Sequence, residues 1–343
     1  MNSNMKAKNV KYTIYFTVLF LLLLTALIFN ICFGSVKIPL SKLISIFLNG
    51  SSKNNLQSTV VWNIRLPRII GAIISGACLS CAGLLMQIFF RNPIVGPSVL
   101  GISSGSSLFV GFIILAGVKL GFKGSSSMLM ILAGFAGATF VMIIILGISY
   151  KIKNVVTLLI IGIMVGYICT AVTNFLITFS TKEQLQGFQM WNLGSFSGFT
   201  WANIKYMLLL SIPFLLVTFL ISKPLNALLL GESYARSMGV NIKVLRIIVI
   251  FTASILTAIP TSFAGTVSFI GLAVPHIIRL TFKTSDNKLL IPGTILFGAV
   301  IAGFCDLLAR LLFLPVELPI STITSFVGAP VVIILILKSR KGL

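Results

Sequence analysis

The sequence predicts an all-α, polytopic membrane protein with about ten transmembrane helices. Of its 343 residues, 57% are hydrophobic and only 9% are charged, and the mean hydropathy is +1.10. A soluble domain carries about 25% charged residues, so this composition does not fit one. The apolar residues also fall in runs of about 20, the length that a helix needs to cross the hydrocarbon layer. We expect residues 1–343 to form a single transmembrane domain.

Ten apolar runs are candidates for the spanning helices. The first follows three lysines and is longer than the core of a signal peptide, so we expect it to remain as a spanning helix. The runs lie near residues 12–33, 69–90, 97–117, 127–149, 154–178, 202–222, 244–264, 267–282, 289–314 and 322–337.

Basic residues indicate the orientation of these spans, because cytoplasmic loops are enriched in Lys and Arg. With the N-terminus inside, sixteen of the 26 Lys and Arg residues fall in inner loops. This bias favours a cell-membrane protein with both termini in the cytoplasm. The net charge of +21 is then attributed to topology and to anionic membrane lipid, and not to nucleic acid.

Two stretches have a similar build, one in each half of the chain. Residues 65–105 carry Gln87, Asn92 and Pro93 at their turn, and residues 263–298 carry Pro275 and His276 at theirs. With ten spans, the helix at 69–90 runs inward and the helix at 244–264 runs outward. The two halves are therefore predicted to be inverted structural repeats.

A polar break at residues 223–242 interrupts the apolar sequence. It carries Glu232 and Arg236 one helical turn apart, in a chain with only five acidic residues. The charge count places this break on the cytoplasmic side. We interpret it as a cytoplasmic element that is pressed by an energy-supplying partner.

Enzymatic and metal-binding interpretations have little support. Residues 101–105 match the GxSxG pattern of serine hydrolases, but the only histidine lies in another span that has no acidic residue. Cys78 and Cys81 form a CxxC with no second CxxC or nearby histidine to complete a metal site. No GxxxxGK[ST] phosphate loop occurs, so the chain is not expected to bind ATP by that motif.

Arginines gather unexpectedly on the predicted outer side. Arg65 and Arg68 fall at the outer mouth of the second span, where long side chains often snorkel to the interface. Arginine also suits carboxylate recognition by its planar donor fork. Asp306 and Arg310 lie one turn apart and can offset each other's burial. Both interpretations, internal pairing and an outer basic surface, stay open.

Several motifs together resemble one family, the permease subunits of bacterial iron–siderophore and cobalamin ABC importers of the ten-helix, type II design. They occur in the family's order over about residues 60–335. They are residues 65–68 with Gly71-Ala72, Gln87 with 91–93, 100–105, 191–195, 230–240, 269–279, Asp306, Arg310, 317–319 and 327–330.

The resemblance implies a role for each polar site. The elbow at about 223–242 would dock on the ATP-binding subunit, and residues 151–157 would contain the cytoplasmic gate. Arg65, Arg68 and Arg310 would meet glutamates of a solute-binding protein. The coupling residues would be Leu230, Gly231, Glu232, Ala235, Arg236 and Gly239. The translocation path or its structural motif would include Gln87, Asn92, Pro93, Gly101, Gly105, Gly271, Pro275, His276 and Asp306.

The implied function is transport of a ferric–siderophore complex, with haem or cobalamin as alternatives. The chain would pair with a second permease copy or paralogue, an ATP-binding cassette subunit that holds ATP and magnesium, and a solute-binding protein. It would bind no cofactor itself. Ser98, Thr266, Ser268, Ser321 and 287–288 depart from the family's pattern. An ion-coupled secondary transporter is the rival from another class, with Asp306 as its one plausible relay.

Overall fold

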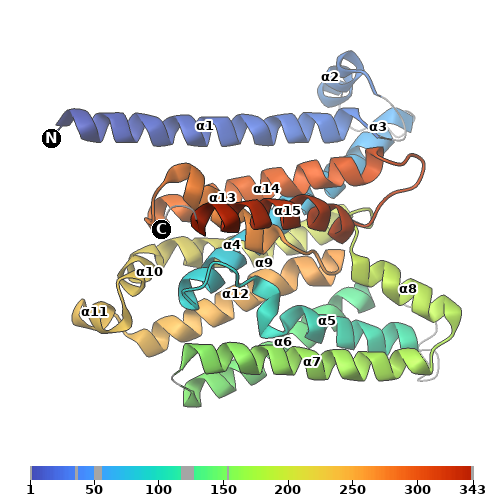
Figure 1. Cartoon of the computed structure of the whole chain (residues 1–343). Coiled ribbons are helices and arrows are strands. Elements are labelled where there is room, and N and C mark those ends of the chain that lie inside the picture. The colour runs from blue at the N-terminus through green and yellow to red at the C-terminus, as the bar shows by residue number, and fades with distance from the viewer. Residues whose placement is uncertain (1, 35–37, 50–55, 117–126, 153, 341–343) are drawn as a thin grey trace.

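The computed structural model describes residues 2–34, 38–49, 56–116, 127–152 and 154–340, and this part of the chain contains helices and loops but no strand. The long helices run roughly along a common direction and form a bundle (Figure 1). Among the basic residues used to orient the chain, those outside the described residues are Lys37, Lys53, Lys119, Lys123, Lys153 and Lys341.

All ten predicted runs coincide with helices, which confirms the all-α polytopic prediction. Within the described residues, seven helices are long and apolar enough to cross a membrane. They are α1 (Asn2–Cys32), α4 (Leu66–Phe89) with its upstream extension, α6 (Ser127–Lys151), α7 (Val155–Thr178), α9 (Trp201–Leu220), α12 (Ile242–Ala264) and α14 (Asn287–Leu311).

The other three runs form shorter apolar helices. The first is α5 (Ile102–Gly111), which continues as the π-helical stretch η3 (Phe112–Ala116). The others are α13 (Ile270–Phe282) and the segment Ile320–Ile334 of α15 (Ile320–Arg340). The predicted starts at residues 97 and 267 were therefore too early, because irregular backbone precedes α5 and α13.

Within the described residues, further helices lie between the predicted spans, among them α2 (Leu40–Asn49), α8 (Lys182–Leu193), α10 (Ser222–Leu229) and α11 (Glu232–Ser237). At α8 a capping box joins Thr181 and Gln184, each side chain bonding the other residue's backbone N–H. A Thr followed three residues later by Gln is a readable helix-start signal. The sequence therefore held evidence for α8 that a search for apolar runs alone overlooks.

The second span begins well before the predicted position. It starts at α3 (Leu56–Val60), passes through the π-helical turn η1 (Val61–Arg65) and continues without a break into α4. Arg65 and Arg68 therefore lie within a continuous helix of 34 residues, and their placement at the outer mouth of the span stays a prediction. The π-helical turn precedes Pro67 and loosens the backbone ladder where proline supplies no N–H.

Helix α4 forms the centre of the bundle. Its residues are buried almost throughout, and it packs against α9, α12, α13 and α14. The close approach to α13 depends on glycine. A Cβ at Gly83 would lie 1.7 Å from the carbonyl oxygen of Gly271, so any side chain there would push the two helices apart.

Short helices α5 and α13 both begin inside the bundle after a break. Helix α5 follows the 3-10 turn η2 (Pro97–Leu100) and Gly101, whose φ is 77°. Helix α13 follows Phe269, whose φ is 64°. Each half of the chain thus contains one such break, at the place where the sequence predicted similar stretches.

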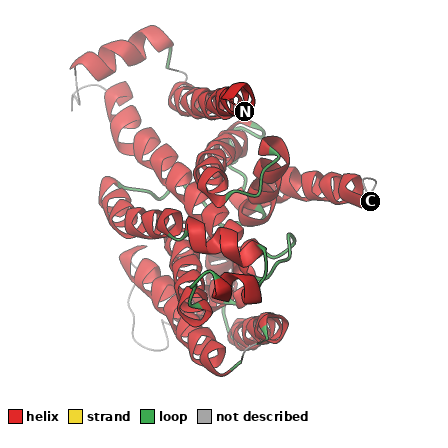
Figure 2. Cartoon of the chain, turned by 90° about the vertical axis from the view of Figure 1, so that its left-hand side faces the viewer, coloured by secondary structure: helices red, strands yellow, loops and turns green. Residues whose placement is uncertain are grey.

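The two ends of the bundle carry different elements. Both chain termini, α10, α11 and the connection between α6 and α7 lie at the left-hand end in Figure 1. Helices α2 and α8 and the C-terminal end of α14 lie at the opposite end. Figure 2 looks onto the end that carries the N-terminus. The separation agrees with the predicted placement of the termini and the 223–242 break on one side.

The contact between Gly83 and Gly271 gives a direct stability test. Gly83→Ala is expected to destabilise the protein by about 1–3 kcal/mol, since overpacking forces the backbone to shift. Gly147→Ala in α6 is the matched control, because an added Cβ there meets nothing within 4 Å. The control should be neutral or stabilising by up to about 1 kcal/mol. Thermal unfolding in detergent measures both, and an equal Tm for the two variants would contradict this packing account.

Candidate functional site

A buried charge cluster lies at the end of the bundle opposite α11. The Nε of Arg68 donates to both carboxylate oxygens of Asp306, at 3.0 and 3.1 Å. Its Nη1 donates to both oxygens of Glu317, at 3.0 and 2.9 Å. The Arg68 and Asp306 side chains are only 7% and 1% exposed, whereas Glu317 is 47% exposed.

The other two predicted arginines join this cluster. Arg310 lies 3.4 Å from Asp306, measured from Nε to Oδ2, and its Nη2 donates to the Asn30 side chain in α1. Arg65 donates from Nη1 to the carbonyl oxygens of Ile31 and Cys32. The structure therefore brings Arg65, Arg68 and Arg310 together, as the sequence predicted.

The burial of these arginines changes their interpretation. All three residues are at most 6% exposed, so their guanidinium groups point into the protein and bond to its own oxygens. Internal pairing of Asp306 with arginine is present in the structure, while docking of a binding protein stays a prediction. Glu317 is the exposed member, and sequence reasoning gave it no role. The sequence feature that could have identified Glu317 is the scarcity of acidic residues, of which it is one of five.

The predicted elbow is a turn between two short helices at the other end. Helix α10 ends at Leu229, and Gly231 then adopts a φ of 119° before α11 begins at Glu232. An added Cβ at Gly231 would meet nothing within 4 Å, so backbone conformation alone requires glycine here. Gly239, with a φ of 83°, ends the elbow in the same way.

The elbow presents an apolar surface. Leu230 is 67% exposed, Tyr234 51% and Met238 61%, while Ala235 is fully buried beneath them. Sequence reasoning named Leu230 and Ala235 but missed Tyr234 and Met238. These two lie four residues apart, on one face of a short helix, and that spacing was the available signal.

Glu232 links the elbow to the body of the protein. Its carboxylate lies 4.0 Å from the Arg236 guanidinium and 3.8 Å from that of Arg246 in α12. Arg246 in turn donates from Nη1 to the carbonyl oxygen of Ile152, at 2.7 Å. Ile152 begins the connection between α6 and α7, within the predicted gate at 151–157. A chain of polar contacts therefore joins the elbow to that connection, and Lys153 itself lies outside the described residues.

The predicted path residues occupy the middle of the protein and its adjoining turn. Gln87 donates from Nε2 to the carbonyl oxygen of Leu272 at 3.0 Å and so ties α4 to α13. The Asn92 side chain accepts from the Ile94 N–H and shapes the turn that contains Pro93. Gly105 packs on Gly137 of α6, so helix packing, and not a hydrolase elbow, explains the GxSxG match.

His276 and Pro275 lie in α13. The His276 ring borders a small cavity with Pro93, Ile94 and Val332, and its Nε2 has no hydrogen-bond partner in the described part of the chain. Among the described residues there is also no group of three or more His, Cys, Asp or Glu side chains that could hold a metal ion.

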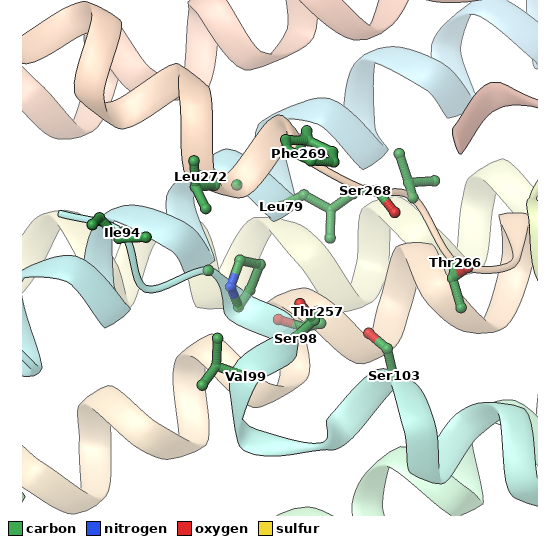
Figure 3. A pocket seen from close by; sticks show the side chains of 14 residues that line it. Leu79, Ile94, Ser98, Val99, Ser103, Thr257, Thr266, Ser268, Phe269 and Leu272 are labelled. Carbon is green, nitrogen blue, oxygen red and sulfur yellow. The ribbon is translucent and has the colours of Figure 1, made fainter. Parts of the chain in front are cut away.

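A cavity of about 270 Å³ opens where α5 and α13 begin (Figure 3). Gly271 forms part of its wall, and an added Cβ at this glycine would lie 2.5 Å from the Pro97 ring. Leu79, near the middle of α4, and Thr257, within α12, border it as well. The cavity therefore lies about halfway along the spanning helices.

The polytopic bundle agrees with a permease subunit of a bacterial ABC importer, and comparison with known proteins shows this class. The chain belongs to the FecCD transport family, whose sequence model matches residues 21–338. It is similar to the vitamin B12 import system permease protein BtuC of Shigella boydii, with 34% identity over 97% of both chains. The corresponding Salmonella typhi protein is 36% identical over 82% of this chain and 84% of its own.

Solved structures agree with this assignment. A metal-chelate type ABC transporter in an inward-facing conformation matches with a TM-score of 0.84 and 28% identity, covering 95% of this chain and 99% of that one. PsaBC from Streptococcus pneumoniae matches with a TM-score of 0.55 and 14% identity, covering 85% and 95%, and shares the fold alone. The protein is thus a multi-pass transport subunit of a bacterial importer.

The charge cluster predicts unequal effects for its two acids. Asp306→Ala should destabilise the protein by about 3–5 kcal/mol, because it leaves buried guanidinium charge without its partner. Glu317→Gln should cost less than about 1 kcal/mol, because Glu317 is half exposed and screened by solvent. Thermal unfolding of both variants in detergent measures the difference. Equal losses would contradict the prediction that burial makes Asp306 the more important partner of the arginines.

Proposed function

We propose that the chain forms the translocation path for a metal chelate and that a separate ATPase subunit drives it through the elbow. The elbow surface is the observation that carries this proposal. Leu230, Tyr234 and Met238 expose apolar side chains around a buried alanine on a short helix that projects from the bundle. An exposed apolar patch of this kind is typical of a protein–protein contact.

The link from Glu232 through Arg246 to Ile152 supports a route for the coupling. Movement of the elbow would pull on the α12 guanidinium and, through it, on the connection between α6 and α7. Binding energy at one end of the bundle can then shift the equilibrium between two conformations, as alternating access requires. In this proposal the elbow end and both termini face the cytoplasm.

The partners of the proposed importer follow from this arrangement. They are an ATP-binding cassette subunit with ATP and magnesium at the elbow, a solute-binding protein at the opposite end, and a second permease copy or paralogue. At the end opposite the elbow, Glu317 is about half exposed and pairs with the buried Arg68. Docking through Arg65, Arg68 and Arg310 would require the binding protein's glutamates to compete with Glu317 and the backbone carbonyls.

A ferric–siderophore complex is the first candidate cargo, supported by the similarity to a metal-chelate type transporter. Cobalamin is the second, and the names of the vitamin B12 permeases at 34–36% identity favour it. Haem is the third alternative. An ion-coupled secondary transporter is disfavoured. Asp306, its candidate ion relay, is paired with Arg68 and Arg310 and so is not available to carry an ion.

Competition for uptake distinguishes the candidate cargoes. Proteoliposomes that hold the complete importer should take up a labelled ferric siderophore in the presence of ATP, and unlabelled cargo should compete. If cobalamin competes more strongly than any siderophore, cobalamin is the cargo instead. Uptake that needs an ion gradient and proceeds without ATP would reject the importer mechanism.

Substitutions in the elbow are expected to impair transport without impairing folding. Glu232→Ala and Gly231→Val should each lower ATP-driven uptake about 5- to 150-fold, which corresponds to a coupling free energy of about 1–3 kcal/mol. The first variant loses the link to Arg246, and the second cannot adopt the φ of 119° without strain. Both proteins should still insert and purify as intact subunits.

Matched controls exist for both substitutions. Glu183→Ala removes an acid that is exposed at the start of α8, at the opposite end of the bundle. Gly198→Val adds the same side chain at a glycine that also has open space but lacks a positive φ. The controls should transport normally. If Glu232→Ala and Gly231→Val transported equally well, the coupling role of the elbow would be abandoned.

A further inference from the structure

The mid-membrane cavity has a mainly apolar lining in which five residues carry hydroxyl groups. Ser98, Ser103 and Thr257 cluster at its centre, and Thr266 and Ser268 follow along the segment that leads into α13 (Figure 3). None of its fourteen lining residues is Lys, Arg, Asp, Glu or His. Hydroxyl groups that face an uncharged, mainly apolar cavity halfway along spanning helices cost free energy unless they bond a ligand or water.

A second cavity of about 410 Å³ adjoins the first between α5, α7 and α8. Ser103 and Thr266 line both cavities, so the two cavities adjoin at these side chains. Its polar lining consists of hydroxyl and amide groups, and again no charged residue contributes. The polar lining residues are Ser103, Ser104, Ser107, Thr170, Thr173, Asn174, Gln189, Asn192 and Thr266.

Some of these hydroxyls are available to a ligand. In the described part of the chain, the Ser98, Ser103 and Ser268 hydroxyls make no hydrogen bond with the protein, although all three border the first cavity. Other lining groups are already engaged: Ser107 donates to the Asn192 side chain at 2.9 Å. The free hydroxyls can therefore donate to or accept from a bound solute without breaking internal bonds.

A hydroxyl from another helix approaches the same segment. Ser321 in α15 donates to the carbonyl oxygen of Thr266 at 2.6 Å. Because Thr266 lines the first cavity, α15 helps to hold the segment that leads into α13.

We propose that the joined cavities bind an electrically neutral cargo rich in carbonyl, amide or hydroxyl groups. A ferric trihydroxamate, in which three anionic ligands balance Fe³⁺, has this chemistry, and so does an amide-bearing corrinoid. A trianionic ferric tricatecholate or a haem with two propionates would bring charge into a site that offers no cation. The N-terminal turns of α5 and α13 add partial positive charge that suits carbonyl oxygens but does not balance several full charges.

The proposal rests on the proposed transport function and is tested first by uptake. The complete importer in proteoliposomes is given three probes: a neutral ferric trihydroxamate, cobalamin and a ferric tricatecholate. Ser103→Ala and Ser268→Ala should each raise KM for the neutral cargo about 2- to 10-fold, the effect of one lost hydrogen bond. Neither substitution breaks an internal bond, so a purely structural role would leave KM unchanged.

Ser106→Ala is the matched control on the same helix. Its hydroxyl donates to the Gly134 carbonyl oxygen at 2.8 Å, on the face of α5 that packs against α6 and away from the cavities. It should leave KM for the neutral cargo unchanged. The proposal would be overturned if KM were unchanged in both Ser103→Ala and Ser268→Ala. It would also be overturned if the tricatecholate were taken up as fast as a neutral probe.

A thiol-labelling experiment tests cargo binding separately from transport. If no probe is transported, that result counts against the transport function alone, and the labelling still tests the binding site. Ser103→Cys is placed in a complex whose five native cysteines are replaced by alanine. Trihydroxamate or cobalamin should slow labelling by N-ethylmaleimide severalfold, and tricatecholate at the same concentration should not. Protection by neither neutral probe, or equal protection by tricatecholate, would overturn the neutral-cargo site. The neutral probe that protects the introduced thiol more strongly identifies the preferred cargo as a hydroxamate chelate or a corrinoid such as cobalamin.

Discussion

The close approach of α4 and α13 is the contact on which the rest of the structure depends. Gly83 meets the backbone of Gly271 where any side chain would collide, and this allows α13 to begin inside the bundle. Irregular backbone at membrane depth is tolerated only where it is buried in protein or lines a cavity. The break before α13 meets both conditions, so one glycine contact produces the unusual start of the helix and the space beside it.

Sequence patterns predicted the spanning helices well, because apolar run length reports directly on the thickness of the bilayer. They also predicted a polar break at residues 223–242, and the family resemblance implied that this break forms an elbow. The extension of the second span to Leu56 was not predicted. The predicted span began near residue 69, whereas the π-helical turn before Pro67 joins α3 to α4 in one continuous helix.

Only part of the candidate site was predicted from the sequence. Rarity made Asp306, Glu232 and the arginines conspicuous, and the structure confirms that the three arginines gather. Their burial could not be read from the sequence, because it depends on Asn30 in α1 and on Glu317, which are distant along the chain. The hydroxyl-lined cavity is similar: single serines carry no pattern until two helix breaks bring them together.

The uncharged lining of the cavities has an electrical consequence. Each elementary charge that moves through a membrane exchanges about 2.3 kcal/mol with a potential of 100 mV. A neutral cargo on a neutral path exchanges none, so its translocation is independent of voltage, whereas a trianion entering a negative interior would cost about 7 kcal/mol more. The work available from ATP is then devoted to conformational change, with nothing lost against the membrane potential.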